Sequence, residues 1–404
     1  MKIVDVDLGG KDISDLPKSH RFYNLINADK LQREHFDNPP LMLVFIYKKL
    51  TQKKMEGQSR AAFDISKVVR DHICAIKNPN YKRIKINPLI VGPTGVGKTY
   101  SIQLASKIVG LPYVEFKMAQ VTPLPIKGNE KLPRSLERLI ENTVIDEKVV
   151  KENLSILKSL DKIDEDTFNA LTQSKEIRQN KEAYNEAYVA TQIYLAERGI
   201  IFLDEIDKIA YTGKGNEVGT KELVQNELLD YLGGQNIRLD TDFGISKKLS
   251  GKEINTSKIL FFLAGAFSDI DKISKGEEPT IDDLKKYGIK SELLGRSGEI
   301  VFFRPLTKKN YEKIINESVI ENDLPLRDLI IAELQNDFPN THISDSAVKY
   351  MATKAEESGL GARYLKSIAG TLSIKVLRNL LYTKGLDCLN DHVNIDEEFL
   401  KAVL

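Results

Sequence analysis

One stretch of the sequence decides most of the fold, and it reads Gly92-Pro93-Thr94-Gly95-Val96-Gly97-Lys98-Thr99. Its spacing is glycine, four residues, then glycine, lysine and threonine. An apolar run ends at Val91 just before it, and a helix-favouring stretch starts at Tyr100. Glycines let the backbone curl so that successive N–H groups point at an anion, and the next helix presents its positive end there. The stretch therefore predicts a phosphate-binding loop between a strand and a helix, in preference to a structural glycine turn.

The residue types in this loop indicate a nucleoside triphosphate and a divalent metal ion. Lys98 is expected to reach the terminal phosphates as a mobile point charge, and the Thr99 hydroxyl is expected to bind Mg²⁺. The predicted cofactors are therefore ATP and Mg²⁺. The predicted nucleotide-binding residues are Gly92, Pro93, Thr94, Gly95, Val96, Gly97, Lys98, Thr99 and Tyr100.

An acidic strand end supplies the second half of the predicted site. The run Ile200-Ile201-Phe202-Leu203 is apolar and ends in Asp204-Glu205. A buried strand that points at the phosphate loop would bring Asp204 to the metal and let Glu205 polarise the attacking water. We therefore predict Mg²⁺ ligation by Thr99 and Asp204, and catalysis by Glu205 together with Lys98.

The composition excludes several other classes of protein. The chain has 404 residues, and 59 Lys and Arg against 58 Asp and Glu give a net charge of +1. A dedicated nucleic-acid binder needs a basic excess, so nucleic acid is an unlikely partner. Two cysteines make no disulfide framework, the histidines lack metal-ligand spacing, and no apolar run is long enough to cross a bilayer. We expect a cytoplasmic protein without a membrane partner.

The chain is predicted to have three regions. Strand candidates at 84–91, 113–117, 200–203, 259–264 and 300–303 alternate with helical segments, which predicts an α/β fold with a parallel sheet flanked by helices. The predicted regions are a leader at 1–54, a large domain at 55–304 and a small, mostly helical lid domain at 305–404. Residues 134–198 contain no glycine or proline and are predicted to be a helical insertion with a break near 161–166.

The sequence resembles the AAA+ ATPases of the Clp/Hsp100 class, and within that class it most resembles the ClpX and HslU families. The run Gly199 to Ile209, which includes the acidic pair, carries the resemblance together with the phosphate loop. Further matches to this family are Gly57-Gln58 with Ala61, Val224-Gln225 with Leu228-Leu229 and Gly233, Thr256 to Phe261, Gly295-Arg296, and Gly361-Ala362-Arg363.

The resemblance implies a P-loop ATPase that forms a ring, usually a hexamer, with ATP bound between neighbouring subunits. Arg296 would reach across the interface to the neighbour's γ-phosphate, and Arg363 would bridge the small domain to the nucleotide of its own subunit. The implied activity is ATP-driven remodelling or unfolding of a protein partner. In the family a Gly-aromatic-apolar-Gly loop grips the substrate. Here the aligned pore-loop candidates are Ile126, Lys127 and Gly128, after Pro125.

Two other functions stay open at this point. The altered pore stretch favours an ATP-controlled assembly switch or scaffold that threads no substrate. A nucleic-acid-associated ATPase is a weaker alternative. Residues 268–288 lack the Ile-Gly-Phe type of docking loop for a ClpP protease, so a protease partner is uncertain.

Overall fold

The structure is a computed structural model that describes residues 38–52, 54–78, 80–81, 85–121, 131–173, 179–211, 218–240, 246–274, 276–321, 324–384 and 392–403. The described residues fall into two compact units. One unit holds the residues up to 70, residues 92–105 and the residues from 302 onward. The other holds residues 71–91 and 106–301. Each unit is described by itself below.

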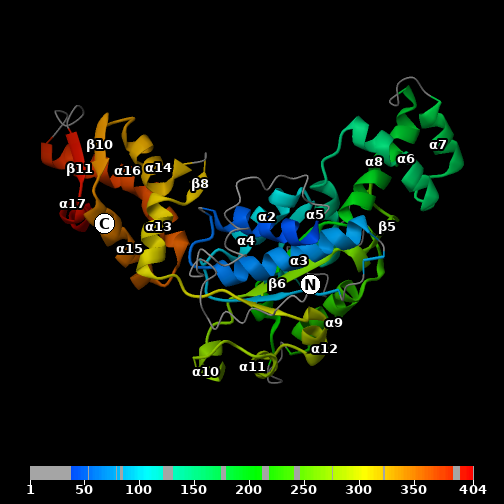
Figure 1. The fold of residues 1–404 in the computed structure, drawn as a ribbon, viewed down its shortest axis with the longest axis horizontal. Helices are drawn as coiled ribbons and strands as arrows, with labels where there is room; N and C mark the ends of the chain where they lie inside the picture. The colour runs from blue at the N-terminus through cyan, green and yellow to red at the C-terminus, as the bar shows by residue number, and fades with distance from the viewer. Residues whose placement is uncertain are drawn as a thin grey trace. The chain divides into compact units, whose positions relative to one another are not determined.

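The second unit is built on a five-stranded sheet with the order β2-β3-β6-β1-β7 (Figure 1). The pairs β2–β3, β3–β6 and β6–β1 are all parallel. All residues of β1 and β6 are buried, as central strands of a covered parallel sheet must be. The strands are β1 (Leu89–Val91), β2 (Tyr113–Lys117), β3 (Ile200–Asp204), β6 (Leu260–Gly265) and β7 (Ile300–Phe302).

The predicted α/β fold is confirmed, and one strand differs in length from its prediction. We expected residues 84–91, but β1 begins at Leu89, and residue 84 lies outside the described residues. Pro88 has no N–H to donate, although its carbonyl accepts from the Leu263 amide at 3.0 Å. A proline at this place ends the ladder, so the strand starts one residue later.

Helices and a short pair of antiparallel strands complete the second unit. Helix α5 packs against β2 and β3, and the Arg138 guanidinium lies 5.5 Å from the ring centre of Phe116. The 3-10 helices are η3 (Met118–Gln120), η5 (Ile206–Ile209) and η7 (Thr256–Lys258), and β4 (Asn236–Arg238) pairs antiparallel with β5 (Glu253–Asn255). The α-helices are α5 (Pro133–Glu141), α6 (Glu147–Ser159), α7 (Glu165–Thr172), α8 (Lys181–Ala196), α9 (Val218–Gly233), α10 (Ile270–Ser274), α11 (Ile281–Tyr287) and α12 (Ser291–Ser297).

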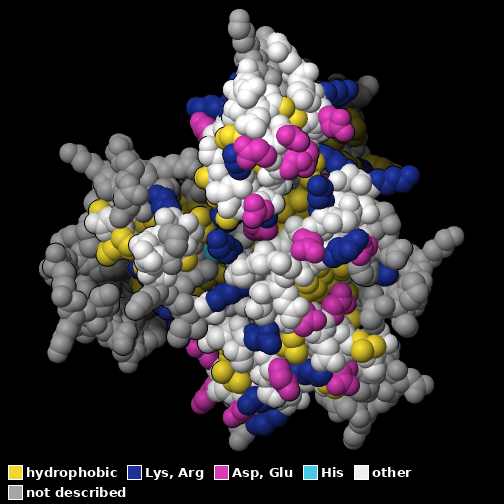
Figure 2. All heavy atoms as spheres, turned by 90° about the vertical axis from the view of Figure 1, so that its right-hand side faces the viewer, with side chains coloured by type: hydrophobic (Ala, Val, Ile, Leu, Met, Phe, Trp, Pro, Cys, Tyr) yellow, Lys and Arg dark blue, Asp and Glu magenta, His cyan; other side chains and the backbone are white. Residues whose placement is uncertain are grey.

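Helices α6, α7 and α8 have a hydrophobic core of their own. Its buried members are Val150, Leu154, Leu157, Ile163, Leu171, Ala183, Ala187 and Ala190. Surface charges pair within and between these helices: Lys148–Glu152 lies within α6, and Lys158–Glu165 joins α6 to α7. Figure 2 faces the side on which these helices lie in Figure 1, and it shows acidic and basic side chains interspersed. The boundaries 134 and 198 of the predicted insertion remain a prediction.

The first unit is mostly helical. Asn38 caps α2 (Pro39–Thr51) by accepting from the Leu41 amide, and prolines occupy the first helical turn. Its small sheets pair β8 (Val319–Glu321) antiparallel with β9 (Leu324–Pro325), and β10 (Asn340–Ile343) parallel with β11 (His392–Ile395). The helices that begin in this unit are α2 (Pro39–Thr51), α3 (Ser59–Lys77), α4 (Lys98–Val109), α13 (Lys308–Asn316), α14 (Leu326–Leu334), α15 (Asp345–Ser358), α16 (Ala362–Lys384) and α17 (Glu397–Val403).

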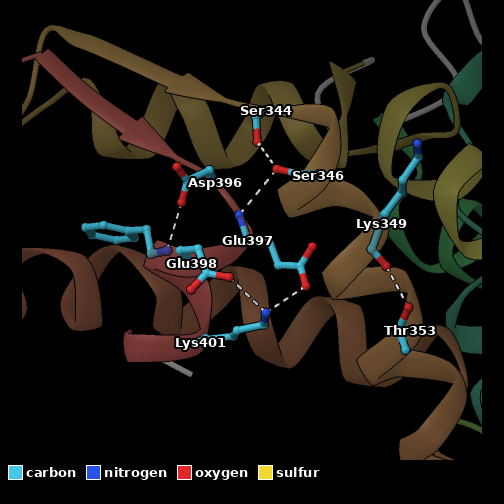
Figure 3. A network of polar contacts seen from close by, with 9 residues as sticks. Ser344, Ser346, Lys349, Thr353, Asp396, Glu397, Glu398 and Lys401 are labelled. Atoms are coloured by element: carbon cyan, nitrogen blue, oxygen red, sulfur yellow. Dashed lines mark hydrogen bonds and ion pairs between the residues drawn. The ribbon is translucent and has the colours of Figure 1, made fainter.

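One hydrogen bond in a network of polar contacts joins the start of α17 to the first turn of α15 (Figure 3). The Ser346 hydroxyl accepts from the Glu397 amide at 3.4 Å and lies 2.8 Å from the Ser344 hydroxyl, which caps α15. Lys401 bonds the carboxylates of Glu397 and Glu398 at 3.0 Å, and these bonds raise the pKa of Lys401 to about 12. Among the described residues, no helix is long and apolar enough to cross a membrane.

Candidate active site

The predicted phosphate loop leaves the end of β1 and enters α4 at Lys98. Gly95 and Gly97 take left-handed backbone conformations, with φ of +73° and +97°, which explains why glycine is needed at both positions. The Lys98 side chain is buried, and its ammonium donates to the carbonyls of Gly92 at 2.6 Å and Pro93 at 2.7 Å. The lysine is therefore held inside the loop by the backbone of the loop itself.

A segment of the C-terminal region touches the backbone of the same loop. The Ala362 amide donates to the Gly95 carbonyl at 2.8 Å, and both residues belong to the first unit. A Cβ at Gly361 would lie 2.7 Å from the Cα of Gly95, so the two backbones approach more closely than any side chain would allow. This contact places exposed Arg363, in the first turn of α16, one residue from the point where α16 meets the loop.

The acidic pair lies at the end of β3, as expected. Asp204 is half-buried, and its carboxylate accepts from the Glu205 amide at 2.8 Å. Glu205 has a left-handed backbone with φ of +61°, which is uncommon for a residue with a side chain. Strained backbone of this kind concentrates at functional sites. The strain occurs at the residue for which the sequence predicts the catalytic role.

The sheet register brings the start of the loop and the acidic pair to one edge. Leu263 of β6 is paired with Leu89 of β1 on one side and with Leu203 of β3 on the other. Asp204 is therefore level with Ile90, and the loop leaves the sheet just beyond that level. Because the three strands are parallel, both features lie at the carboxyl ends of the strands, where open α/β sheets bind their ligands.

Asp207 is a buried acid that the sequence analysis missed. It lies in η5, two residues after Glu205, and is 7% exposed. Its Oδ1 accepts from the Ala266 amide at 3.2 Å, just after β6, and a Cβ at Gly265 would lie 2.8 Å from the same oxygen. Asp207 also raises the pKa of Lys208 by hydrogen bonding and by its charge. The signal was an acid between two isoleucines, Ile206 and Ile209, directly after the acidic pair.

Arg296 lies at the opposite edge of the sheet from Asp204. Its carbonyl accepts from the Asn87 side chain at 3.2 Å, and Asn87 precedes β1, whereas Asp204 is level with Ile90. Asn87 and Ile90 are three residues apart in extended chain, a distance of about 10 Å. The two strand spacings from β1 to β3 add nearly as much sideways. The Arg296 side chain is exposed, and its Nη1 donates to the Leu229 carbonyl of α9 at 2.9 Å.

The pair Gly57-Gln58, which precedes α3, contacts the segment that leads into α13. The Gln58 side chain is buried and donates to the Arg304 carbonyl at 2.7 Å, while it accepts from the Arg304 amide at 3.1 Å. Gly57 has φ of +72°, and a Cβ there would lie 2.8 Å from the Asn310 side chain. The pair therefore fixes the chain that leads into α13.

Three other predicted residues lie outside the described part of the chain, because Ile126, Lys127 and Gly128 fall within residues 122–130. Tyr100 is partly exposed, and burial of its ring raises the pKa of its hydroxyl. Among the described residues, no group of three or more His, Cys, Asp or Glu side chains could hold a metal by itself. One hydroxyl and one carboxylate still suit Mg²⁺, because that ion keeps several waters and binds substrate phosphates.

Residues 83–300 match the family model of the AAA domain (Cdc48 subfamily), which covers more than half of the chain. The chain belongs to the AAA family. This places the phosphate loop and the acidic strand end in a family of ATPases, in agreement with the resemblance found in the sequence.

Curated relatives of this AAA protein are similar along most of their length. The ClpX 2 ATP-binding subunit of the ATP-dependent Clp protease from Wolinella succinogenes is 25% identical, over 88% of this chain and 82% of the relative. The ClpX subunit from Treponema denticola is 26% identical, over 81% of this chain and 75% of the relative. The ClpX subunit from Bacteroides thetaiotaomicron is 27% identical, over 72% of this chain and 65% of the relative.

Proposed function

We propose that this protein is a ring-forming, Mg²⁺-dependent ATPase that uses ATP hydrolysis to remodel or unfold a protein partner. The observation that carries the proposal is the register that sets Asp204 level with Ile90, beside the exit of the phosphate loop. Membership of the AAA family and the similarity to ClpX subunits support the same reading.

In this proposal the chain's own residues bind and orient the triphosphate. The loop from Gly92 to Thr99 surrounds the phosphates with N–H groups, and Lys98 exchanges its bonds to the loop carbonyls for bonds to phosphate oxygens. The Thr99 hydroxyl and the Asp204 carboxylate hold Mg²⁺, which neutralises charge on the phosphates when bound. Glu205 orients a water for attack on the γ-phosphate and takes its proton, while the bond from the γ-phosphorus to the bridging oxygen breaks and ADP leaves.

Two arginines complete the proposed site from different directions. Arg363 binds the nucleotide of its own chain, since its helix begins at the contact with Gly95. Arg296 acts on the nucleotide of a neighbouring subunit, because it lies at the far edge of its own sheet from Asp204. An arginine supplied in this way is worth about 10³–10⁵ in turnover in related phosphoryl-transfer enzymes. The oligomer is a homo-oligomeric ring, and six subunits are the number that the family resemblance suggests.

The partner of the ring is proposed to be a protein. The curated relatives are subunits of a Clp protease, whereas residues 268–288 of this chain lack the Ile-Gly-Phe type of docking loop. An assembly switch without threading is the second candidate, favoured by Ile126 in place of an aromatic grip. A folded, tagged substrate separates the two, because only a remodelling enzyme unfolds it with ATP. A cytoplasmic location stays a prediction from sequence.

The test is the substitution Glu205→Gln, which keeps the shape of the side chain and removes its basicity. We expect ATP to bind with unchanged affinity while hydrolysis falls by about 10²–10⁴-fold, the usual contribution of a general base. Glu115→Gln, at an exposed position of the neighbouring strand β2, is the matched control and leaves turnover unchanged. Normal turnover in the Glu205 variant would remove this residue from its proposed role.

The proposed action of Arg296 on a neighbour is tested by mixing. Arg296→Ala and Glu205→Gln subunits are each expected to be inactive alone. Mixed rings contain sites with an intact Glu205 beside an intact Arg296, so activity returns. Persistent inactivity in mixtures that native mass spectrometry shows to be mixed rings would contradict the proposal.

A further inference from the structure

One face of helix α9 lies along helix α12, which carries Arg296. Gln225, Leu229 and Gly233 follow one another at intervals of four residues, so they lie in a row on that face. All three are within the second unit, as is α12. Each of them contacts either α12 or the residue before it.

The start of α12 is held by the first part of this row. The buried Gln225 side chain accepts from the Lys290 amide at 2.9 Å, and Lys290 is the residue that precedes α12. The Lys290 ammonium bonds Glu222 at 2.8 Å and Asn226 at 2.6 Å. The ion pair with Glu222 raises the pKa of Lys290 and lowers the pKa of Glu222.

The end of α12 is held by the last part of the row. Arg296 Nη1 donates to the Leu229 carbonyl at 2.9 Å and lies directly over Gly233. A Cβ at position 233 would overlap Nη1, so the guanidinium takes this place only above a glycine. The last carbonyls of a helix carry partial negative charge, which favours a cation at this position.

The contact leaves the guanidinium able to bind a second group. Arginine has five N–H donors, and the Leu229 carbonyl takes one of them. The side chain is exposed, so the other N–H donors of the guanidinium are accessible to a second group. A guanidinium held in this way has lost rotamer freedom before it meets a phosphate, and such pre-organisation lowers the cost of forming the transition state.

The same helix contacts the turn that follows Glu205. The Gln225 amide donates to the Ile209 carbonyl at 2.8 Å, at the end of η5, and to the Gly288 carbonyl at 3.1 Å. One side chain therefore links the turn of the proposed general base to the start of the helix that bears the arginine.

We propose that α9 is a cradle that positions Arg296 for action on a neighbouring subunit, with Gly233 as the positioning residue that makes room for the guanidinium. This inference rests on the proposed function. Gly233 touches no substrate and acts only through Arg296.

The substitution Gly233→Ala tests the cradle. The added Cβ displaces the guanidinium, so we expect kcat for ATP to fall about tenfold or more, while KM stays the same. The melting temperature is expected to stay level, because the displaced group is the far end of a flexible side chain. Gly219→Ala is the matched control in the same helix, where a Cβ would meet nothing within 4 Å.

A second experiment distinguishes positioning of Arg296 by Gly233 from a general structural effect of the substitution. In an Arg296→Ala background, Gly233→Ala should change kcat no further, because two groups that act through one interaction are non-additive. An equal additional loss in that background would overturn the inference, as would a higher kcat for Gly233→Ala alone.

Failure of the cradle and failure of the proposed function give different results. If Arg296→Ala leaves turnover normal, the action of Arg296 on a neighbour is wrong and the cradle has nothing to position. If Arg296→Ala is inactive while Gly233→Ala behaves like Gly219→Ala, the proposed function stands and the cradle is overturned.

Discussion

At the scale of single residues, the contact between Gly95 and Gly361 sets the local geometry of the loop. Gly359 and Gly361 both have left-handed backbones, with φ of +65° and +66°. A Cβ at Gly361 would lie 2.6 Å from the carbonyl carbon of Gly95, whereas a Cβ at Gly359 would meet nothing within 4 Å. Both glycines therefore need a left-handed backbone, and they differ only in the atoms that an added Cβ would meet.

This pair gives a matched prediction for nucleotide binding. Either substitution by alanine strains a left-handed residue at a cost of about 1 kcal/mol. Gly361→Ala also forces the backbone away from Gly95, which adds about 1–3 kcal/mol, as overpacked sites do. We expect calorimetric titration with ATP to show weaker binding for Gly361→Ala and near-normal binding for Gly359→Ala. Equal affinities would show that the contact with Gly95 does not shape the loop.

At the scale of elements, the helices of the predicted insertion are defined by their caps and their own core. Asp146, Asp164 and Asn180 cap α6, α7 and α8 by accepting from a backbone amide three residues later. Buried Glu197, which follows α8, accepts from Lys162 and from the Asn255 amide of β5. The helices thus have local start signals as well as a tertiary attachment.

The cap of α7 predicts a local pH dependence. Hydrogen bonds from Thr167 hold the pKa of Asp164 below its ordinary value of 3.8. A lowered pKa stabilises the folded cap above the unfolded pKa, and the stabilisation is lost as the pH falls through the folded pKa. An NMR titration of the Asp164 carboxyl carbon should therefore give a midpoint below 3.8.

The control for this titration is Asp164→Asn, because asparagine caps a helix without titrating. The Thr167 amide signal should follow the Asp164 midpoint in the unsubstituted protein and lose that step in the variant. A step of the same size in both proteins would assign it to another group.

At the scale of the whole molecule, one chain carries the two halves of the proposed catalytic machinery at opposite edges of its sheet. Asp204 lies where β3 ends, and the main chain of Arg296 lies beside Asn87, before β1 begins. Within one subunit the main chain of Arg296 therefore lies about 10 Å along the strands, and nearly as far across them, from Asp204. This separation is the reason for proposing that Arg296 acts on the nucleotide of a neighbouring subunit.

Dilution tests this arrangement directly. ATPase activity per subunit is expected to fall as the protein is diluted below the concentration at which sedimentation shows dissociation. Arg296→Ala, already slow, should show no such dependence. Full activity per subunit in a solution shown to contain only monomers would contradict an arginine supplied by a neighbour.

Much of the fold followed from local sequence patterns. The parallel strands were predicted from short apolar runs, and four of the five have bounds within one residue of the prediction. The strand before the phosphate loop was predicted too long, because the apolar pattern of 84–91 outweighed the missing amide of Pro88. The roles of the site residues remain predictions that the experiments above address.

The sequence by itself determined the phosphate loop, the acidic strand end and the family, because each is encoded by residue types at fixed short spacing. Only the tertiary structure decided that Asp204 is level with Ile90, that Gly361 meets Gly95, and that Arg296 lies over Gly233. The physical reason is that these relations join segments from tens to hundreds of residues apart. Strand register and close backbone packing set such contacts, and neither leaves a periodic signal in the chain.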